Sequence, residues 1–453
     1  MHHSISHVLA RLNQDLGEIL STDAVLEACR KAGYSWRERT LDPVATVSLF
    51  LLQILNGNTA CQHVVHFGQW AFTASAYCKA RKRLPLLVLQ SLMESVAARF
   101  RSVTAESADW LGHRVWMIDG SGFSMPDVPE LQKHFGSPSN QRPGCGFPVG
   151  HLVGLFDLAT GMLLRVTVSP MRTHDMSQAS HLARELKPGD LVLGDTGFCS
   201  YAHLSMLLER GNHAVFRMHQ KQIVDFTPGR ERATRRSYTA NPGGLPHSLW
   251  VRSNGHLDQV VVWSRPKQKP RWMTAERFAE LPAEITVREL RYEVSTPGFR
   301  VRIITLVTTL LDPLIYPKAE LAELYRKRWR IELNLRHIKI TMKMDSLHCK
   351  TVDGVIKELT MFALAYNLVR SVMFESARGR EVTVAVERMG FLDALRWLTN
   401  PIPGGNLSDI LINPLRPNRI EPRVIKRRMK KYPLMKEPRK VLRNRLMGQE
   451  VAA

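Results

Sequence analysis

The chain lacks the features that would place it in a membrane or in an oxidising compartment. Its six cysteines form no CxxC pair and no repeated spacing, which argues against a zinc ribbon and a disulfide framework. Its most apolar stretch, residues 44–55, falls well short of the roughly 20 residues that a transmembrane helix needs. The first residues include Asp15 and Glu18 and contain no uninterrupted apolar run. We therefore expect no signal peptide and a cytoplasmic protein.

Several common catalytic motifs are also missing. No GxSxG turn surrounds Ser121 or Ser124, so the sequence does not indicate a serine hydrolase. The histidines near the predicted core form no HxH or HxxxH pair, which disfavours a histidine metal centre. We find no internal repeat and no low-complexity tract.

The chain is strongly basic. It carries 63 Lys and Arg against 41 Asp and Glu, a net charge of +22. Such a surplus repels itself unless an anion is near, so DNA, RNA or an anionic membrane is the expected partner. A merely basic cytosolic protein is the alternative that charge leaves open. With 453 residues of ordinary globular composition, two or three folded units are expected.

The N-terminal region, residues 1–105, has a helical pattern. Apolar residues recur at spacings of three and four from Ser6 to about Arg101, which predicts five or six short helices. The segment TASAYCKARKRL (residues 73–84) places Arg81 and Arg83 on a short basic helix like a DNA-recognition helix. A solvated basic helix face explains the same pattern.

In residues 106–219 the sequence pattern changes from that of helices to that of strands. Two strand-like segments, residues 151–158 and 163–169, follow a β-rich run that begins near His113, and a meander of three strands is the simplest interpretation. Helices and strands then alternate, which indicates parallel additions to the sheet. The resulting order β-β-β-α-β-α-β is that of a ribonuclease-H-like fold.

The remainder of the chain divides into three predicted parts. Residues 220–309 alternate in short strands and predict an all-β insertion. Residues 310–380 return to the α/β domain with a long helix, residues 318–339, and an apolar helix, residues 354–373. Residues 381–453 form a C-terminal region that ends in a basic arm.

The arm between residues 416 and 445 contains thirteen Lys or Arg, two Glu and four prolines. This composition predicts a poorly folded segment that binds phosphates without sequence preference. Its most basic part supplies four of the residues that we expect to contact DNA: Arg427, Arg428, Lys430 and Lys431.

Two aspartates lie at the ends of predicted strands. Asp119 ends the first strand in MIDGSGF, where Gly120 and Gly122 leave room for a ligand. Asp195 ends a later strand in LVLGDTGFCSY and is followed by Gly197. Strand ends are where ligands bind in open α/β sheets, so both are candidate site residues. A structural turn or helix-capping aspartate is the alternative for either taken singly.

The segment YRKRWRIELNLRHIK is the most specific signal. It places Tyr325, Arg328, Glu332 and Lys339 at spacings of three, four and seven, on one face of an α-helix. A charged helix face with i,i+4 pairs would explain the charges. It would not explain Tyr325 or the two aspartates at strand ends.

These residues resemble the signature of the insertion-sequence-four family of DDE transposases: Tyr, two residues, Arg, three residues, Glu, six residues, Lys. The segments IDGSGF and GDTGFCSY are similar to the family's two aspartate motifs. The resemblance extends from about Arg114 to Thr341. It implies a ribonuclease-H-like catalytic domain with a β-strand insertion.

The resemblance also implies the chemistry. Asp119, Asp195 and Glu332 would bind two Mg²⁺ ions, with Mn²⁺ possible, while Tyr325, Arg328 and Lys339 would hold the phosphates of the transposon end. Carboxylate oxygens suit these ions, and two ions can stabilise both the attacking and the leaving oxygen. The expected partners are double-stranded DNA, as terminal inverted repeats and target, and a second copy of the chain on the bacterial nucleoid.

Two alternatives remain open from the sequence. One is a nuclease on the same fold that does not transpose, and the other is a DNA-binding regulator or domesticated relic without catalysis. Hairpin-forming family members also carry a tryptophan on the last strand of the insertion, where this chain has none between residues 301 and 323. Trp250, Trp263 and Trp272 lie earlier in the insertion, and packing roles are the alternative for each.

Overall fold

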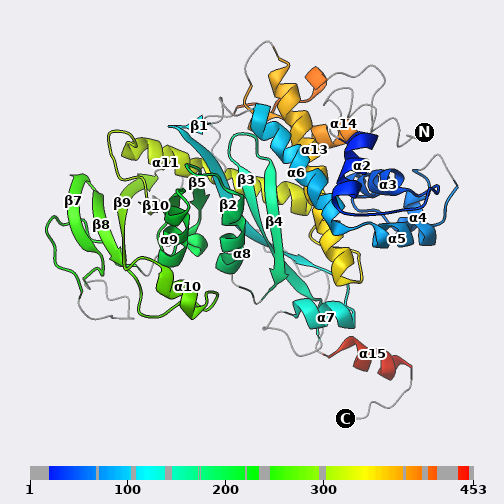
Figure 1. Ribbon diagram of the computed structural model, residues 1–453, viewed down its shortest axis with the longest axis horizontal. Helices are drawn as coiled ribbons and strands as arrows, with labels where there is room; N and C mark the ends of the chain where they lie inside the picture. The colour runs from blue at the N-terminus through cyan, green and yellow to red at the C-terminus, as the bar shows by residue number, and fades with distance from the viewer. Residues whose placement is uncertain are drawn as a thin grey trace.

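A ten-stranded mixed sheet runs through the molecule and carries helices on both faces (Figure 1). The computed structural model describes residues 20–67, 71–103, 109–137, 145–171, 173, 175–219, 222–233, 245–294, 302–380, 384–399, 407–415 and 437–447. Its strands follow the order β4-β3-β2-β5-β6-β10-β9-β8-β7, and β1 pairs with β2 beside this path. The architecture is therefore mixed α/β.

The strands have the following bounds: β1 Asp109–Trp110, β2 His113–Ser124, β3 Val149–Asp157, β4 Leu163–Pro170, β5 Leu191–Gly194, β6 His213–Arg217, β7 Leu249–Gly255, β8 Asp258–Ser264, β9 Glu284–Val294 and β10 Arg302–Thr308. The predicted meander is confirmed, because β2 pairs with β3 and β3 with β4, both antiparallel. The predicted parallel additions are also confirmed, since β5 runs parallel to β2 and β6 parallel to β5.

Five helices precede the sheet within residues 20–103: α2 Thr22–Lys31, α3 Pro43–Leu55, α4 Cys61–Val64, α5 Ala74–Arg83 and α6 Leu86–Val103. Polar side chains fix where they begin. Asp42 caps α3, with its Oδ1 accepting from the backbone N–H of Ala45 at 2.7 Å. Thr73 caps the basic helix α5 in the same way.

The helices between and after the strands are α7 Pro129–Phe135, α8 Asp175–Leu182, α9 Tyr201–Glu209, α10 Ala275–Glu280, α11 Lys318–Lys327, α12 Arg330–Arg336, α13 Val352–Arg378, α14 Phe391–Thr399 and α15 Arg439–Leu446. Short 3-10 turns are η1 Ala183–Glu185, η2 Thr196–Phe198, η4 Val386–Arg388 and η5 Leu407–Asp409, whereas η3 His337–Thr341 is a π-helix.

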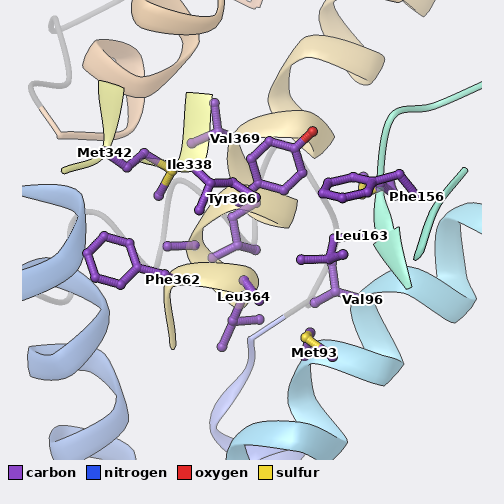
Figure 2. Packing of buried hydrophobic residues seen from close by; sticks show 14 of the residues in the cluster. Met93, Val96, Phe156, Leu163, Ile338, Met342, Phe362, Leu364, Tyr366 and Val369 are labelled. Carbon is purple, nitrogen blue, oxygen red and sulfur yellow. The ribbon is translucent and has the colours of Figure 1, made fainter. Parts of the chain in front are cut away.

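The main core lies between the sheet and α13. Figure 2 shows Phe362 and Tyr366 of α13 packed among side chains from the sheet, such as Phe156, and from α6, such as Met93. Helices α8 and α9 cover the opposite face of the sheet with a second buried cluster. Burial of this large apolar surface is the dominant favourable term for folding, and it fixes the strand ends that carry the candidate site.

Three expectations need correction. The insertion is not all-β, because α10 (Ala275–Glu280) lies within it, and its strands continue the main sheet through the pairing of β10 with β6. The predicted helix over residues 318–339 is in three parts, since α11 ends at Lys327 and a π-helix begins at His337. Part of the predicted unfolded arm is the helix α15 (Arg439–Leu446).

Candidate active site

Asp119 lies inside β2 rather than at its end, because the strand continues to Ser124. The parallel pairing of β2 with β5 ends at Met117, however, so Asp119 lies just beyond the last β2 residue that pairs with β5. Its Oδ1 accepts from the backbone N–H of Gly120 at 2.8 Å, and its side chain is 20 % exposed. Burial raises the pKa of Asp119 to about 6, and the negative charges of Asp195 and Glu332 add to this rise.

Asp195 follows β5 directly and caps the 3-10 turn η2. Its Oδ1 accepts from the backbone N–H of Gly197 at 2.8 Å. The capping role that was the alternative for this residue is therefore present. It does not remove Asp195 from the site, because its charge still acts on both Asp119 and Tyr325.

The helical segment that carries Glu332 has a break in its hydrogen bonding between α11 and α12, where Arg328 and Trp329 donate to the third residue before them and not to the fourth. Tyr325 lies buried in the last turn of α11, and burial raises the pKa of its hydroxyl to about 12. Arg328 lies at the break and is 12 % exposed. Its guanidinium binds Glu332 Oε1 at 2.9 Å and lies 3.7 Å from Asp119 Oδ2. Arg328 thus joins the third carboxylate to the first.

Lys339 completes the segment from the π-helix η3. Its Nζ lies 3.4 Å from Ser121 Oγ, two residues along β2 from Asp119. The structure therefore brings Asp119, Asp195, Glu332 and Lys339 to one region of the sheet, although the segment that carries Glu332 and Lys339 is not one continuous α-helix.

Within the described ranges, no group of three His, Cys, Asp or Glu side chains is arranged to hold a metal ion. Glu332 faces the guanidinium of Arg328 instead. The donor set still fits a hard divalent cation, since it consists of carboxylate oxygens. The raised pKa of Asp119 supports this fit, because a carboxyl disfavoured as an anion by burial, and further by its acidic neighbours, gains from a nearby cation.

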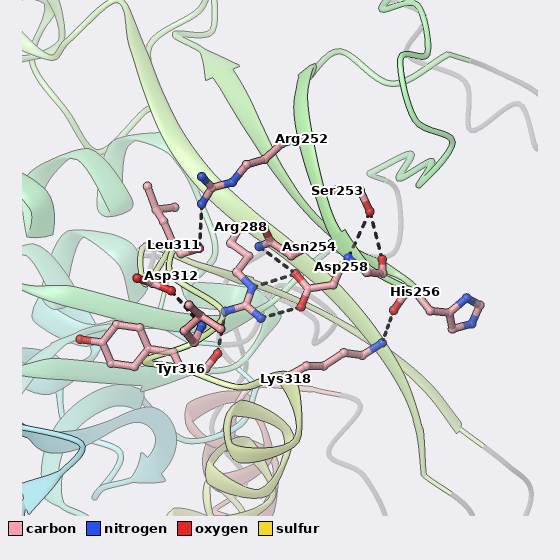
Figure 3. A network of polar contacts seen from close by, with 12 residues as sticks. Arg252, Ser253, Asn254, His256, Asp258, Arg288, Leu311, Asp312, Tyr316 and Lys318 are labelled. Atoms are coloured by element: carbon pink, nitrogen blue, oxygen red, sulfur yellow. Dashed lines mark hydrogen bonds and ion pairs between the residues drawn. The ribbon is translucent and has the colours of Figure 1, made fainter.

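The site is joined to the insertion through a buried network (Figure 3). The guanidinium of Arg288 on β9 binds Asp258 on β8 at 2.5 and 2.8 Å, and neither side chain is more than 4 % exposed. Arg288 also donates to the carbonyl of Tyr316 at 2.7 Å, and Lys318, the first residue of α11, donates to the carbonyl of His256 at 2.7 Å. The insertion therefore holds the start of α11.

Arg81 does not lie on an exposed recognition surface. Its guanidinium donates to Gln53 Oε1 at 2.8 Å and to Cys349 Sγ at 3.2 Å, and it lies 3.8 Å from the centre of the Phe50 ring. These contacts tie α5 to α3 and to the segment before α13, which does not fit a role in contacting DNA. Arg83 is exposed. Arg427, Arg428, Lys430 and Lys431 lie outside the described residues.

Two features escaped the sequence analysis. His151 on β3 and Asp175 of α8 form a 2.5 Å pair beside Gly120. A Cβ at Gly120 would lie 3.1 Å from the His151 ring, so this glycine makes room for protein side chains rather than for a ligand. The second feature is Trp329, which follows Arg328 in the chain and is 57 % exposed. A single tryptophan among the charged residues of RKRWRIE could have indicated this exposed ring.

Two tryptophans of the insertion have packing roles. Trp263 is buried, and its Nε1 donates to Glu289 Oε1 at 2.9 Å. Burial raises the pKa of Glu289, and the Trp263 bond opposes this rise. Trp272 packs against the cluster that includes Ala202 of α9.

In the described part of the chain, no helix has both the length and the apolar character needed to cross a membrane.

Comparison with known proteins agrees with this geometry. The Transposase DDE domain family matches residues 110–368, more than half of the 453 residues, and these residues include Asp119, Asp195 and Glu332. The chain belongs to this family of transposases.

Individual relatives place it more closely. The chain is 25% identical over 377 residues to the transposase InsG for insertion sequence element IS4 of Escherichia coli (strain K12), covering 79% of this chain and 78% of that protein. It is 19% identical over 433 residues to the transposase for insertion sequence element IS231C of Bacillus thuringiensis subsp. berliner, covering 86% and 88%. These matches confirm the resemblance to the insertion-sequence-four family.

A putative transposase of Escherichia coli (strain K12), InsZ, is 28% identical over 201 residues, which cover 44% of this chain and 64% of that protein. Among solved structures, the piggyBac transposase synaptic complex with hairpin DNA aligns over 86% of this chain and 80% of that chain, with 10% identity and a TM-score of 0.41. A similarity at this level supports no further statement.

Proposed function

We propose that this chain is the transposase of an insertion sequence, which binds terminal inverted repeats, cuts the DNA there and joins it to a target. The observation that carries the proposal is the gathering of three carboxylates at one region of the sheet, where Arg328 binds Glu332 at 2.9 Å and lies 3.7 Å from Asp119. Burial raises the pKa of Asp119 to about 6, and the charges of Asp195 and Glu332 add to this rise. Acidic groups gathered in this way on a chain of net charge +22 are typical of a functional site.

We assign Asp119, Asp195 and Glu332 as the ligands of two divalent cations, Mg²⁺ or Mn²⁺. Their oxygens are the donors that such ions prefer. When bound, two such ions supply the positive charge that activates an attacking oxygen and neutralises a leaving one. Glu332 would exchange Arg328 for these cations, since the two side chains are paired in this structure.

Arg328, Lys339 and Tyr325 would hold the phosphates of the DNA end. A guanidinium can bind a phosphate through two parallel hydrogen bonds, which would replace the present bond to Glu332. The ammonium of Lys339 lies over β2 beside Ser121 and offers a compact positive charge. The high pKa of Tyr325 keeps its hydroxyl protonated, so that it remains a donor at neutral pH.

The order of the central strands supports a ribonuclease-H-like catalytic domain. Strands β4, β3 and β2 form an antiparallel meander, and β5 and β6 are added in parallel with α8 and α9 on one face. In this proposal residues 106–219 and 310–380 form the catalytic domain around the insertion of residues 220–309. Residues 1–105 bind the terminal repeats, and residues 381–453 add affinity for phosphates.

A second copy of the chain would take part on the DNA, because a synapsis joins two ends. The protein would then act on the bacterial nucleoid. If both transposon ends are cleaved within one complex, their uncut forms should be lost at the same rate. A DNA substrate that carries one transposon end should therefore be cut more slowly than a substrate that carries two. Equal rates for the two substrates would argue against this pairing.

The decisive experiment measures the release of a 3′-hydroxyl at a terminal repeat. We expect cleavage with Mg²⁺, none with EDTA and none with Asp119→Asn, while the variant still binds DNA. Equal cleavage by the variant would refute the assignment of Asp119. The Asp345→Asn variant, which removes an exposed carboxylate, serves as the control and should retain activity.

The same experiment separates the alternatives. Cleavage without any product joined to target DNA would favour a nuclease that does not transpose. Binding to the repeats without cleavage by the unaltered chain, with Mg²⁺ or Mn²⁺ present, would favour a DNA-binding regulator or a domesticated relic.

A further inference from the structure

A cavity of about 510 Å³ opens in the N-terminal helical region, away from the three carboxylates. It lies between the segment that joins α2 to α3, the start of α3 and the last turn of α5. Buried Pro43, Thr46, Ala80 and Leu84 form part of its lining. Its volume lies within the range of about 300–1,000 Å³ that is typical of small-molecule sites.

Two aromatic side chains form part of the wall. The rings of Tyr34 and Trp36 have centroids 5.9 Å apart and planes inclined by 33°. Both residues are half-buried, so each ring is supported from behind and still reaches the cavity. Aromatic rings held in this way are platforms on which nucleic acid bases stack.

Three arginines and a single carboxylate supply the charge. Arg37 and Arg39 come from the joining segment and Arg83 from the end of α5, and all three are exposed. The carboxylate is that of Asp42, which caps α3 through the N–H of Ala45. The cavity therefore has a mainly basic rim above partly apolar walls, and guanidinium groups suit phosphate oxygens.

We propose that this cavity binds one unstacked nucleotide of DNA. The base packs against Tyr34 and Trp36, and Arg37, Arg39 and Arg83 hold the adjoining phosphates. Asp42 is placed to accept from an exocyclic amino group, as acidic side chains do with cytosine. A nucleotide within DNA is favoured over a free nucleotide because the arginines are spread around an open and exposed rim, where they can contact successive phosphates.

This inference rests on DNA being the substrate of the chain, but it does not depend on the carboxylates. It also gives Arg83 a definite role. The predicted basic helix then contributes its exposed last turn to DNA, while Arg81 of the same helix holds the region together.

The test compares two duplexes in EDTA, so that cleavage plays no part. One contains a single unpaired deoxycytidine and the other is fully paired, and fluorescence anisotropy measures the affinity of the full chain for each. We expect a preference for the unpaired duplex that falls roughly tenfold in Trp36→Ala, because the base no longer stacks on an indole ring. Trp36→Phe, which keeps a ring, should retain most of the preference.

The arginines give a test that does not endanger the fold, since they are exposed. Arg37→Gln should weaken binding to the unpaired duplex more than Arg271→Gln, which removes one exposed positive charge in the same way in the loop before α10. Equal effects of these charge changes, or an equal decrease in affinity for both duplexes in Trp36→Ala, would overturn the proposal.

Photocrosslinking locates the base directly. 5-Iododeoxycytidine at the unpaired position should crosslink to Tyr34 or Trp36, as mapped by mass spectrometry. Crosslinks confined to other residues, such as the exposed Trp329, would overturn the proposal. Deoxycytidine monophosphate should compete weakly; if it binds as tightly as the unpaired duplex, the cavity is a site for free nucleotides and the assignment to DNA is wrong.

Discussion

Arg328 binds Glu332 through a 2.9 Å ion pair, at the break that separates α11 from α12. The same guanidinium lies 3.7 Å from Asp119. It therefore neutralises part of the charge of the acidic cluster. A divalent cation and Arg328 compete for the same carboxylates, and a DNA phosphate that bound Arg328 would release Glu332.

The first prediction follows from this competition. Arg328→Gln should raise the affinity for Mn²⁺ several-fold in the absence of DNA, because Glu332 loses its partner. The same variant should cut DNA about 10²-fold more slowly, since a donor to the phosphate is removed. Electron paramagnetic resonance measures free Mn²⁺ during the titration. Arg326→Gln, which breaks only the exposed pair with Glu323, is the matched control; unchanged Mn²⁺ affinity in Arg328→Gln would contradict the argument.

A second prediction concerns stability and pH. Asp119 has a pKa of about 6 in the folded chain against an ordinary value of 3.8, so the folded state binds this proton more tightly than the unfolded state. Its contribution to the free energy of unfolding is therefore favourable at low pH and is lost as pH rises from about 4 to about 6. Asp119→Asn should raise the free energy of unfolding at pH 7.5 by about 1 to 3 kcal/mol.

The check is urea unfolding of Asp119→Asn and of the unaltered chain at several values of pH. The gain should disappear toward pH 4, where Asp119 is protonated in the folded state. Cation binding should follow the opposite course and weaken below about pH 6, because a ligand carboxyl must be ionised. A stability gain that did not change with pH would show that burial of this charge is not the cause.

The buried pair between Asp258 and Arg288 gives a third prediction. Asp258→Asn should lower the free energy of unfolding by about 3 to 5 kcal/mol, because it leaves the Arg288 charge buried without its partner. Cleavage should fall as well, since Arg288 also holds the carbonyl of Tyr316 before α11. Thermal unfolding and cleavage assays measure the two effects. Glu276→Gln, on the exposed surface of α10, is the control and should leave the free energy of unfolding nearly unchanged.

The fourth prediction tests the basic arm. Deleting the chain after Pro414 should weaken DNA binding and flatten its dependence on salt, because fewer counterions are released. Replacing Arg427, Arg428, Lys430 and Lys431 with Gln should reproduce part of the effect, with the slope reduced by roughly 0.9 for each phosphate that the arm no longer neutralises. This second variant keeps α15, whose Arg439 pairs with Asp127 at 3.1 Å. An unchanged salt slope in both variants would show that the arm does not touch DNA.

The sheet was largely predictable from the sequence because its signals are local. Alternating apolar residues and the Thr160-Gly161 turn predict β3 and β4, and the turn has Gly161 in the left-handed region with φ 70°. The same alternation predicts the strands of the insertion. That β10 pairs with β6, and so joins the insertion to the main sheet, depends on an interaction between distant segments that no local pattern contains.

The break between α11 and α12 could not be predicted for a related reason. Residues 318–341 contain no proline or glycine, and the spacing of Tyr325 and Glu332 fits an unbroken helix. Helices in proteins take most of their stability from tertiary packing, and both sides of the break are packed in the core, where Leu324 and Ile331 are fully buried. The orientation of Arg81 has the same origin, because a basic helix has identical spacing whether its arginine faces solvent or Gln53.

The pairing of β10 with β6 also limits how the insertion can move. A swinging flap would have to break the backbone pairing of Leu306, Val307 and Thr308 with β6. The outer strands β7 and β8 are thus joined to the strand that carries Asp119 through an unbroken series of paired strands. The insertion is a continuation of the catalytic sheet and not a hinged appendage.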